Sequence, residues 1–215
     1  MEYLVTMTTH VPDGTSEQAV ADVREREAAH TRELAAHDHI LRLWRPPLAP
    51  GEWRTLGLFA AADRAELEQV LASMPLHVWR SDEVTELAHH PNDPAASAQS
   101  RPAPGRPEFL TTFVTDIPDG TPAPAVRDAR AGEAKRTREL ADQGRLTRLW
   151  LLPAWPDESH ALGLWRGQDT ADVRAMLDSL PLAPWLTEEI TPLVPHPSDP
   201  AAAGSRPAAA SAGPS

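Results

Sequence analysis

The 215-residue sequence contains no cysteine, which excludes disulfide bonds, thiolate metal sites and a cysteine nucleophile. It also lacks an excess of basic residues, because the net charge is -11. Nucleic acids and anionic membrane surfaces select for clustered Lys and Arg, so neither is expected as a partner. No stretch approaches the roughly 20 apolar residues of a membrane span. Residues 1–9 have neither the basic nor the apolar part of a secretory signal, so we expect a cytoplasmic protein.

The sequence also lacks the short motifs of several large enzyme classes. It has no Gly-rich phosphate loop, no nucleophile elbow and no dinucleotide fingerprint. Several histidines of the first half, such as His37 and His39, have no counterpart in the second half. No metal-ligand spacing occurs in both halves, so we expect no metal site.

Two copies of one pattern make up most of the chain. Arg42-Leu43-Trp44 recurs as Arg148-Leu149-Trp150, an offset of 106 positions. At this offset residues 2–94 align with residues 108–200 without a gap, and roughly four positions in ten are identical. Only two copies are present, which indicates a tandem duplication rather than a solenoid.

The repeat sets the expected domain limits. We predict one domain over residues 1–94 and a second over residues 108–200, each of ordinary single-domain size. Residues 95–107 are rich in Ala, Ser, Pro, Gly and Arg, a composition typical of a flexible linker. Residues 201–215 have the same composition and little apolar surface to bury, so we expect a disordered tail.

Each copy predicts the element order β-α-β-β-α-β. In the first copy the expected strands are residues 2–9, 40–45, 53–60 and about 78–87, and the expected helices are about 16–37 and 63–73. Thr15 and Asp63 are expected N-caps, and Gly144 is expected to end the long helix of the second copy. The predicted class is α+β with two ferredoxin-like domains. The sheet face without helices must be buried, and two such sheets in one chain can bury each other.

A carboxylate interrupts the apolar stripe of each long helix. Glu27 shares its stripe with Val20, Val23, Thr31 and Leu34, and Glu133 occupies the same place in the second copy. Burying a charge is costly unless it is paired or neutralised, and burial raises a carboxyl pKa toward the range useful for proton transfer. Glu27 and Glu133 are therefore candidate catalytic residues. A purely structural ion pair with an arginine explains the same pattern.

The Arg-Leu-Trp strand supplies candidate binding residues. Strict alternation places Ile40, Arg42 and Trp44 on one face. A guanidinium beside an indole can hold a substrate carboxylate while the ring lines the pocket. In the alternative interpretation, Arg42 pairs with Glu27 and Trp44 belongs to the core. The candidate substrate-binding residues from this motif are Arg42, Trp44, Arg148 and Trp150.

Two further pairs recur in both copies. Trp79 and Trp185 follow a Pro-Leu pair at the start of the last predicted strand, where a large aromatic lines either a pocket or a core. His90 and His196 each precede proline in a His-Pro-Asn/Ser-Asp-Pro segment. Histidine titrates near neutral pH and can carry a proton, although such a residue also serves as a surface or capping group. We retain the tryptophans as candidate binding residues and the histidines as candidate catalytic residues.

Taken together, these motifs resemble the muconolactone isomerase family. The resemblance covers nearly the whole of each copy and rests mainly on Arg42-Leu43-Trp44-Arg45, Met74-Pro75-Leu76 and His90-Pro91-Asn92 with their second-copy equivalents. It implies a ferredoxin-like fold assembled as a dimeric α+β barrel, here within one chain. It also implies proton-transfer chemistry on a small lactone or enone without any cofactor. The family strand usually has a lysine where this chain has Thr6 and Thr112, which indicates a different substrate.

These expectations leave more than one function open. The first is a cofactor-independent isomerase or cyclase that uses Glu27, Glu133 or both, with a small molecule as its substrate. The second is a non-catalytic binding or accessory protein on the same barrel, and the fold also hosts cofactor-free monooxygenases. We expect an intrachain pseudo-dimer that is a monomer or a low homo-oligomer, because the duplication already buries the surface that family members bury between chains.

Overall fold

The computed structural model describes residues 1–96, 106–153 and 160–203. The first copy contains β1 (Glu2–Thr9), α1 (Glu17–Ala36), β2 (Ile40–Arg45), β3 (Arg54–Ala60), α2 (Arg64–Ser73), the 3₁₀ segment η1 (Pro75–Trp79), β4 (Arg80–His89) and η2 (Pro94–Ala96). The second copy contains β5 (Glu108–Thr115), α3 (Ala123–Asp142), β6 (Leu146–Leu151), β7 (His160–Arg166), α4 (Thr170–Asp178), η3 (Ala183–Trp185), β8 (Leu186–Pro195) and α5 (Pro200–Ala203). Both copies have the predicted order, and the α+β class is confirmed.

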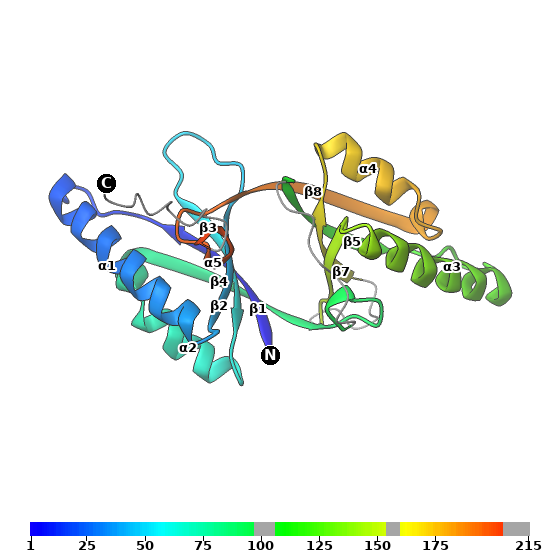
Figure 1. Cartoon of the computed structure of the whole chain (residues 1–215), viewed down its shortest axis with the longest axis horizontal. Helices are drawn as coiled ribbons and strands as arrows, with labels where there is room; N and C mark the ends of the chain where they lie inside the picture. Colours follow the sequence, from blue (N-terminus) through cyan, green and yellow to red (C-terminus); the bar gives the residue numbers. More distant parts are fainter. Residues whose placement is uncertain (97–105, 154–159, 204–215) are drawn as a thin grey trace, which may run out of the picture. The chain divides into compact units, whose positions relative to one another are not determined.

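Within each copy the helices cover one face of an antiparallel sheet. The strand order is β4-β1-β3-β2 in the first copy and β8-β5-β7-β6 in the second. Figure 1 shows α1 and α2 on the same side of the first sheet. The core between α1, α2 and this sheet is formed by apolar side chains that include Tyr3, Val5, Leu34, Phe59 and Leu67. No helix in the described part of the chain is both long and apolar enough to cross a membrane.

Local chemistry explains the helix ends, with one correction. Asp63 caps α2 as expected, and its carboxylate accepts the backbone N–H of Glu66 at 2.9 Å. The cap of α1 is Ser16 rather than Thr15. The Thr15 hydroxyl instead donates to the Pro12 carbonyl and closes the preceding turn, so it is not available to the helix. Gly144 follows α3 with a positive φ of 67°, the conformation expected of a helix stop.

The last strand of each copy begins later than the sequence indicates. The segment before β4 is the 3₁₀ turn η1, in which the His77 N–H donates to the Met74 carbonyl at 2.9 Å. Pro75 has no N–H and fits the first position of such a turn. Trp79 and Trp185 therefore end 3₁₀ segments, and the prediction that they start strands is wrong.

A bulge in β2 changes which side chains share a face. The pairing of β2 with β3 shifts register between Ile40 and Arg42. As a result Ile40 packs in the helix-side core together with Leu43, and not on the face of Arg42. The strict alternation predicted for residues 40–45 is thus wrong at its first residue.

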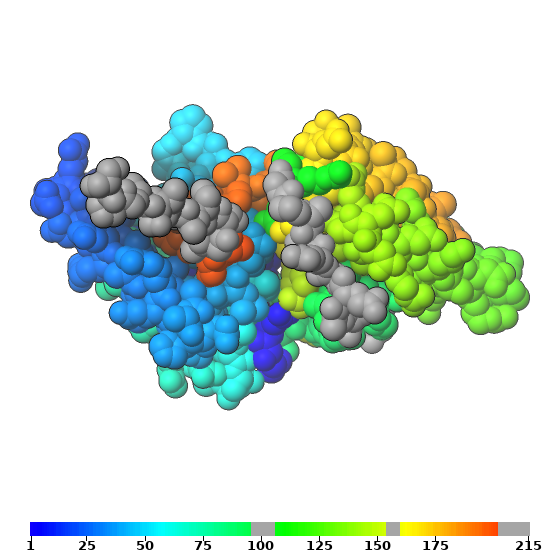
Figure 2. All heavy atoms as spheres, viewed as in Figure 1, coloured from blue at the N-terminus to red at the C-terminus, as the bar shows by residue number. Residues whose placement is uncertain are grey.

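The compact units of the chain do not coincide with the two repeats. One unit combines Tyr3–Val84 with the residues that follow Val194, and the other combines Met1–Glu2 with Thr85–Val194. Each copy is thus completed by a segment that belongs to the other copy in sequence. Figure 2 shows the orange and red atoms of the C-terminal segment lying against the blue atoms of the first copy. In the predicted tail, Ala201–Ala203 belong to α5, and the rest lies outside the described residues.

Each copy binds an end segment of the other copy, and we call these the exchanged segments: residues 90–93 of the first copy and residues 196–199 of the second. A pairing of arginine with aspartate, here called the clamp, holds each exchanged segment. The Arg42 guanidinium donates to both carboxylate oxygens of Asp199 at 3.0–3.3 Å, and the Leu43 N–H donates to the same carboxylate at 3.1 Å. In the other unit, Asp93 accepts the Leu149 N–H at 3.0 Å and lies 3.4 Å from Arg148. Asp199 and Asp93 are almost fully buried, with side chains 1% and 3% exposed. The Arg-Leu-Trp strand of one copy therefore binds the His-Pro-x-Asp segment of the other.

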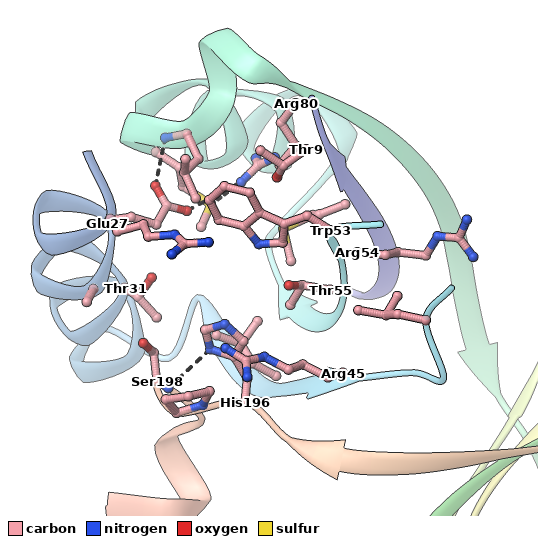
Figure 3. A pocket seen from close by; sticks show the side chains of 18 of the residues that line it. Thr9, Glu27, Thr31, Arg45, Trp53, Arg54, Thr55, Arg80, His196 and Ser198 are labelled. Carbon is pink, nitrogen blue, oxygen red and sulfur yellow. Dashed lines mark hydrogen bonds and ion pairs between the residues drawn. The ribbon is translucent and has the colours of Figure 1, made fainter. Parts of the chain in front are cut away.

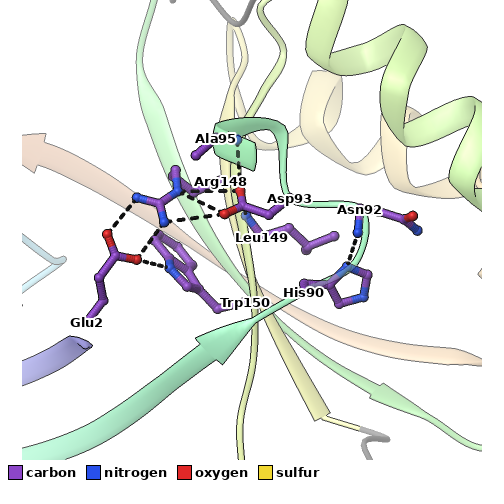
Figure 4. Close-up of polar contacts among 8 residues, drawn as sticks. All are labelled: Glu2, His90, Asn92, Asp93, Ala95, Arg148, Leu149 and Trp150. Carbon is purple, nitrogen blue, oxygen red and sulfur yellow. Dashed lines mark hydrogen bonds and ion pairs between the residues drawn. The ribbon is translucent and has the colours of Figure 1, made fainter. Parts of the chain in front are cut away.

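Figure 4 shows that the carboxylate of Glu2 also binds Arg148 in the second clamp. Glu2 accepts hydrogen bonds from the Arg148 guanidinium at 3.0 Å and from the Trp150 indole at 2.7 Å. Burial alone would raise the pKa of Glu2, but these hydrogen bonds and the charge of Arg148 hold it below its ordinary value. The chain start is thereby fixed to the second copy.

We expect Asp199→Ala to lower the free energy of unfolding by about 3 kcal/mol, because it removes the buried carboxylate that accepts hydrogen bonds from the Arg42 guanidinium and the Leu43 N–H. Asp199→Asn should be intermediate, since its amide oxygen still accepts the Leu43 N–H. Urea denaturation measures both, with the exposed Asp178→Ala as the control. Equal stability of Asp199→Ala and Asp178→Ala would show that the clamp does not stabilise the fold.

Candidate active site

A cavity of about 710 Å³ lies in the unit built on the first copy. This volume is within the range of sites for drug-sized ligands. Four arginines, Arg24, Arg45, Arg54 and Arg80, and two carboxylates, Glu27 and Glu52, are among its lining residues. Figure 3 shows three threonine hydroxyls, those of Thr9, Thr31 and Thr55, around the same space. The pocket thus combines a net positive lining with one carboxylate on the helix wall.

Glu27 is that carboxylate, and it lies on α1 as the stripe predicts. Its side chain is 14% exposed. One oxygen accepts the Leu76 N–H at 2.8 Å, and the other lies 3.5 Å from the Arg80 guanidinium. Burial raises the pKa of Glu27 above its ordinary value, although the Leu76 hydrogen bond and the charge of Arg80 oppose this shift. The carboxylate is therefore oriented by a backbone donor and has an increased proton affinity.

Arg80, and not Arg42, is the arginine beside Glu27. The Arg80 side chain is 2% exposed and also pairs with Asp82 at 2.6 Å. The alternative in which Arg42 pairs with Glu27 is therefore wrong, because Arg42 lies on β2 and is bound to Asp199. Arg80 is the first residue of β4 and lies far from Glu27 in sequence, so no local pattern in the sequence links the two residues.

The second copy keeps the carboxylate but changes its surroundings. Glu133 accepts the Leu182 N–H at 3.1 Å, just as Glu27 accepts that of Leu76. The position of Arg80 is taken by Leu186, which packs against the core of the second copy. No cation pairs with Glu133 in the described part of the chain, and burial raises its pKa. The two carboxylates therefore share a backbone donor and differ in charge environment.

The exchanged segment brings His196 to the pocket of the first copy. The Ser198 N–H donates to Nδ1 of His196 at 3.1 Å, and the His196 N–H donates to the Leu43 carbonyl at 3.0 Å. A ring nitrogen that accepts a hydrogen bond carries no proton, so in the neutral ring the proton lies on Nε2. Burial, together with the charge of Arg45, lowers the pKa of His196 to about 4. The imidazole is therefore neutral at physiological pH, with a fixed tautomer.

His90 has the same local structure in the other unit. The Asn92 N–H donates to its Nδ1 at 3.0 Å (Figure 4), and burial lowers the pKa of His90 to about 4. Both histidines are thus half-buried and do not lie fully exposed on the surface. The residue that follows three positions later in each segment, Asp93 or Asp199, was missed by sequence reasoning. Its presence in both copies was the signal for it.

The predicted aromatic and arginine binding residues lie elsewhere. Arg42, Trp44 and Trp79 are not among the residues that line the described cavity. The Arg42 guanidinium lies over the Trp44 ring at 4.7 Å while it binds Asp199, and Arg148 lies over Trp150 in the same way at 4.6 Å. These arginines bind the segments supplied by the other copy, and the contact of the Arg–Trp pairs with a substrate stays a prediction. Trp185 is half-buried, and its carbonyl accepts the Asp116 N–H at 2.8 Å.

The family model for muconolactone delta-isomerase matches residues 1–93 and again residues 108–199. The chain belongs to this family. Its two matched segments correspond to the two copies, so the chain is a tandem duplication of the family domain. One copy is 28% identical over 92 residues to muconolactone delta-isomerase 1 of Acinetobacter lwoffii, covering 43% of this chain and 93% of that protein. One copy is also 29% identical over 92 residues to the muconolactone delta-isomerase of Cupriavidus pinatubonensis, and this match covers 43% of this chain and 97% of that protein.

Solved structures resemble the whole chain at lower sequence identity. The chlorite dismutase of Candidatus Nitrospira defluvii, in complex with imidazole, is 12% identical with a TM-score of 0.59, and the match covers 90% of this chain and 91% of that one. A heme-binding protein of Thermus thermophilus is 11% identical with a TM-score of 0.54, over 90% and 92% of the two chains. At these identities the likeness concerns the fold alone. It shows that the ferredoxin-like architecture of the duplicated chain occurs in other proteins.

We expect the two histidines to make the fold sensitive to acid. Between pH 6.5 and about 4 the unfolded chain binds protons at His90 and His196 that the folded chain does not bind. The free energy of unfolding should therefore fall as the pH decreases through this window. Urea denaturation across this range should give a shallower pH dependence for the double variant His90→Asn/His196→Asn, whose amide oxygens can replace the Nδ1 acceptors. An unchanged slope, equal to that of the exposed-residue control His10→Asn, would contradict this.

Proposed function

We propose that this protein is an isomerase or cyclase that moves a proton within a small lactone or enone, with Glu27 as its general base and acid. The observation that carries the proposal is the Glu27 carboxylate in the wall of the first-copy cavity, where burial raises its pKa. Membership of the muconolactone delta-isomerase family supports the reaction class. General acid–base catalysis works best when the pKa of the catalytic group approaches the working pH.

The proposed reaction is redox-neutral. Glu27 takes a proton from the carbon next to a carbonyl group, and the electron pair of the broken C–H bond moves onto the carbonyl oxygen. The same carboxyl then returns the proton to a different carbon, and the double bond is displaced with no net change in atoms or electrons. Such a step needs no electron acceptor, which is why we propose a cofactor-independent enzyme. In this proposal the oxygen that accepts the Leu76 N–H orients the carboxylate, and the other oxygen, 3.5 Å from the Arg80 guanidinium, takes and returns the proton.

The second copy has a different proposed role. At the positions equivalent to Arg80 and Arg45, the second copy has the apolar residues Leu186 and Leu151. We assign turnover to the first copy. The second copy provides the segment that carries His196. This asymmetry distinguishes the chain from a duplication with two equal sites.

A haem site is not supported by the residues of the cavity. The heme-binding structural neighbour raises this alternative, and His196 is the histidine that lines the described cavity. A histidine that ligates a metal through Nε2 normally donates its Nδ1–H to another group. Nδ1 of His196 instead accepts the Ser198 N–H, so the ring carries its proton on Nε2. No group of three or more acidic or histidine side chains in the described part of the chain is arranged to hold a metal ion.

The alternative of a non-catalytic binding protein rests on the missing family lysine. Thr6 occupies that position. Its neighbours Val5 and Met7 are the residues of β1 that are buried on the helix side, and Thr6 is not among them. The replacement therefore removes no cation from the cavity that contains Glu27. Arginines line that cavity, so the lysine argument does not outweigh the catalytic interpretation.

The test is hydrogen exchange into a substrate of the family type. We expect the protein in D₂O to introduce deuterium into muconolactone or into related unsaturated lactones and enones, followed by NMR. Glu27→Gln should reduce this rate by about 100-fold or more, since general base catalysis typically contributes 10²–10⁴-fold. Glu133→Gln is the matched control and should retain most of the rate. Exchange no faster than in buffer for every compound, or equal rates for wild type and Glu27→Gln, would contradict the proposal.

We also propose the intrachain dimeric α+β barrel that the resemblance implies. Its support is the exchange of end segments, by which each compact unit includes residues of the other copy. One chain would then replace two chains of the single-copy relatives. We expect light scattering to give a mass of one or two times 23.4 kDa. A mass far above that of a dimer would contradict this arrangement.

A further inference from the structure

The cavity has a second polar end, formed by Arg45 and His196. Figure 3 shows the two side chains next to each other, across the cavity from Glu27. Arg45 is the exposed last residue of β2 and lines the cavity. Among the described residues, its guanidinium forms no hydrogen bond or ion pair. The neighbouring Arg42 is, by contrast, bound to Asp199. An arginine with an open guanidinium at the wall of a cavity is a ready donor for an anionic oxygen.

The state of the imidazole completes this donor pair. Because Nδ1 accepts the Ser198 N–H, the Nε2–H is the group that remains to bind a partner in the cavity. Two charged groups act on the ring: Arg45 from β2 disfavours its protonation, and Asp199 from its own segment favours it. Asp199 is already bound by Arg42 and by the Leu43 N–H, so its charge is largely neutralised. A protonated ring would therefore lie beside an uncompensated guanidinium.

The second copy shows that this arrangement is particular to the first. The residue equivalent to Arg45 is Leu151, while His90 retains the same turn geometry as His196. The turn around the histidine therefore forms without an adjacent arginine. In the first copy the arginine lines the same cavity as the Glu27–Arg80 pair.

We propose that the His196 Nε2–H and the Arg45 guanidinium together hold the oxyanion that develops on the substrate when Glu27 removes its proton. His196 is then a neutral hydrogen-bond donor and not a proton carrier. This inference rests on the proposed function, because it assigns the oxygen end of the same reaction. A donor placed at a developing oxyanion typically contributes 10²–10³-fold to the rate. The site is complete only when the segment of the second copy is bound to the first.

The first experiment determines the protonation of His196 directly. ¹⁵N NMR of the full chain labelled at histidine, assigned with His196→Asn, should show a neutral ring protonated at Nε2 from pH 5 to pH 8. A ring that titrates with a midpoint near 6.5, or a neutral ring protonated at Nδ1, would overturn the proposal. This measurement needs no substrate, so its result is independent of any activity.

The second experiment measures anion binding with benzoate as the probe, because it is a planar ring that carries an oxyanion. Benzoate should produce a saturable shift of the His196 Nε2 signal, and Arg45→Leu should weaken its binding at least tenfold. His196→Asn keeps an acceptor for the Ser198 N–H but has no donor in place of the Nε2–H. This variant should therefore bind benzoate at least tenfold more weakly, and backbone amide shifts of residues that line the cavity measure its affinity. His196→Gln, whose amide N–H reaches the Nε2 position, should restore part of the affinity.

The exposed-residue variant His10→Asn is the control and should bind benzoate as wild type does. Circular dichroism verifies that each variant is folded. The absence of a saturable shift in wild type, or an affinity that Arg45→Leu and His196→Asn leave unchanged, would overturn the proposal. If benzoate binds as expected while Glu27→Gln still exchanges deuterium at the wild-type rate, the proposed function fails and the anion site stands.

Discussion

The buried pairing of an arginine with an aspartate from the other copy is the interaction on which the structure depends. Arg42 and the Leu43 N–H bind Asp199, and Arg148 and the Leu149 N–H bind Asp93. A buried carboxylate without such donors would be strongly destabilising, so each segment is held in one position. The consequence for function is direct. Asp199 is three residues from His196, and the clamp therefore determines where the imidazole enters the first-copy cavity.

Duplication within one chain allows the two copies to diverge, which identical subunits cannot do. Glu27 and Glu133 retain the same backbone donor, yet only Glu27 has an arginine beside it among the described residues. A buried carboxylate with a nearby cation retains some access to its ionised form, whereas an isolated one favours protonation. The two copies therefore differ in the charge around this carboxylate, while the backbone hydrogen bond that orients it is the same. This difference supports the proposal that turnover belongs to the first copy.

Much of the fold followed from the sequence, because its signals are local. The repeat, the strand and helix order, the Asp63 cap and the Gly144 stop all depend on residues within one turn or strand. The partly buried position of Glu27 followed from helical periodicity. The partner of Glu27, the bulge in β2 and the role of Arg42 could not be predicted, because each depends on contacts between distant segments. The Arg42–Asp199 pair joins residues of different copies, and no spacing rule within one copy indicates it.

We propose that the reacting molecule lies on the helix side of the first sheet, between Glu27 and His196, and not on the face of Arg42 and Trp44. A crystal structure of the full chain with a bound unsaturated lactone analogue tests this most directly. We predict that the ligand lies within hydrogen-bond distance of the Glu27 carboxylate and has an oxygen directed at Arg45 and His196. A ligand bound to Arg42 and Trp44, with Asp199 displaced from the guanidinium, would contradict this position of the substrate.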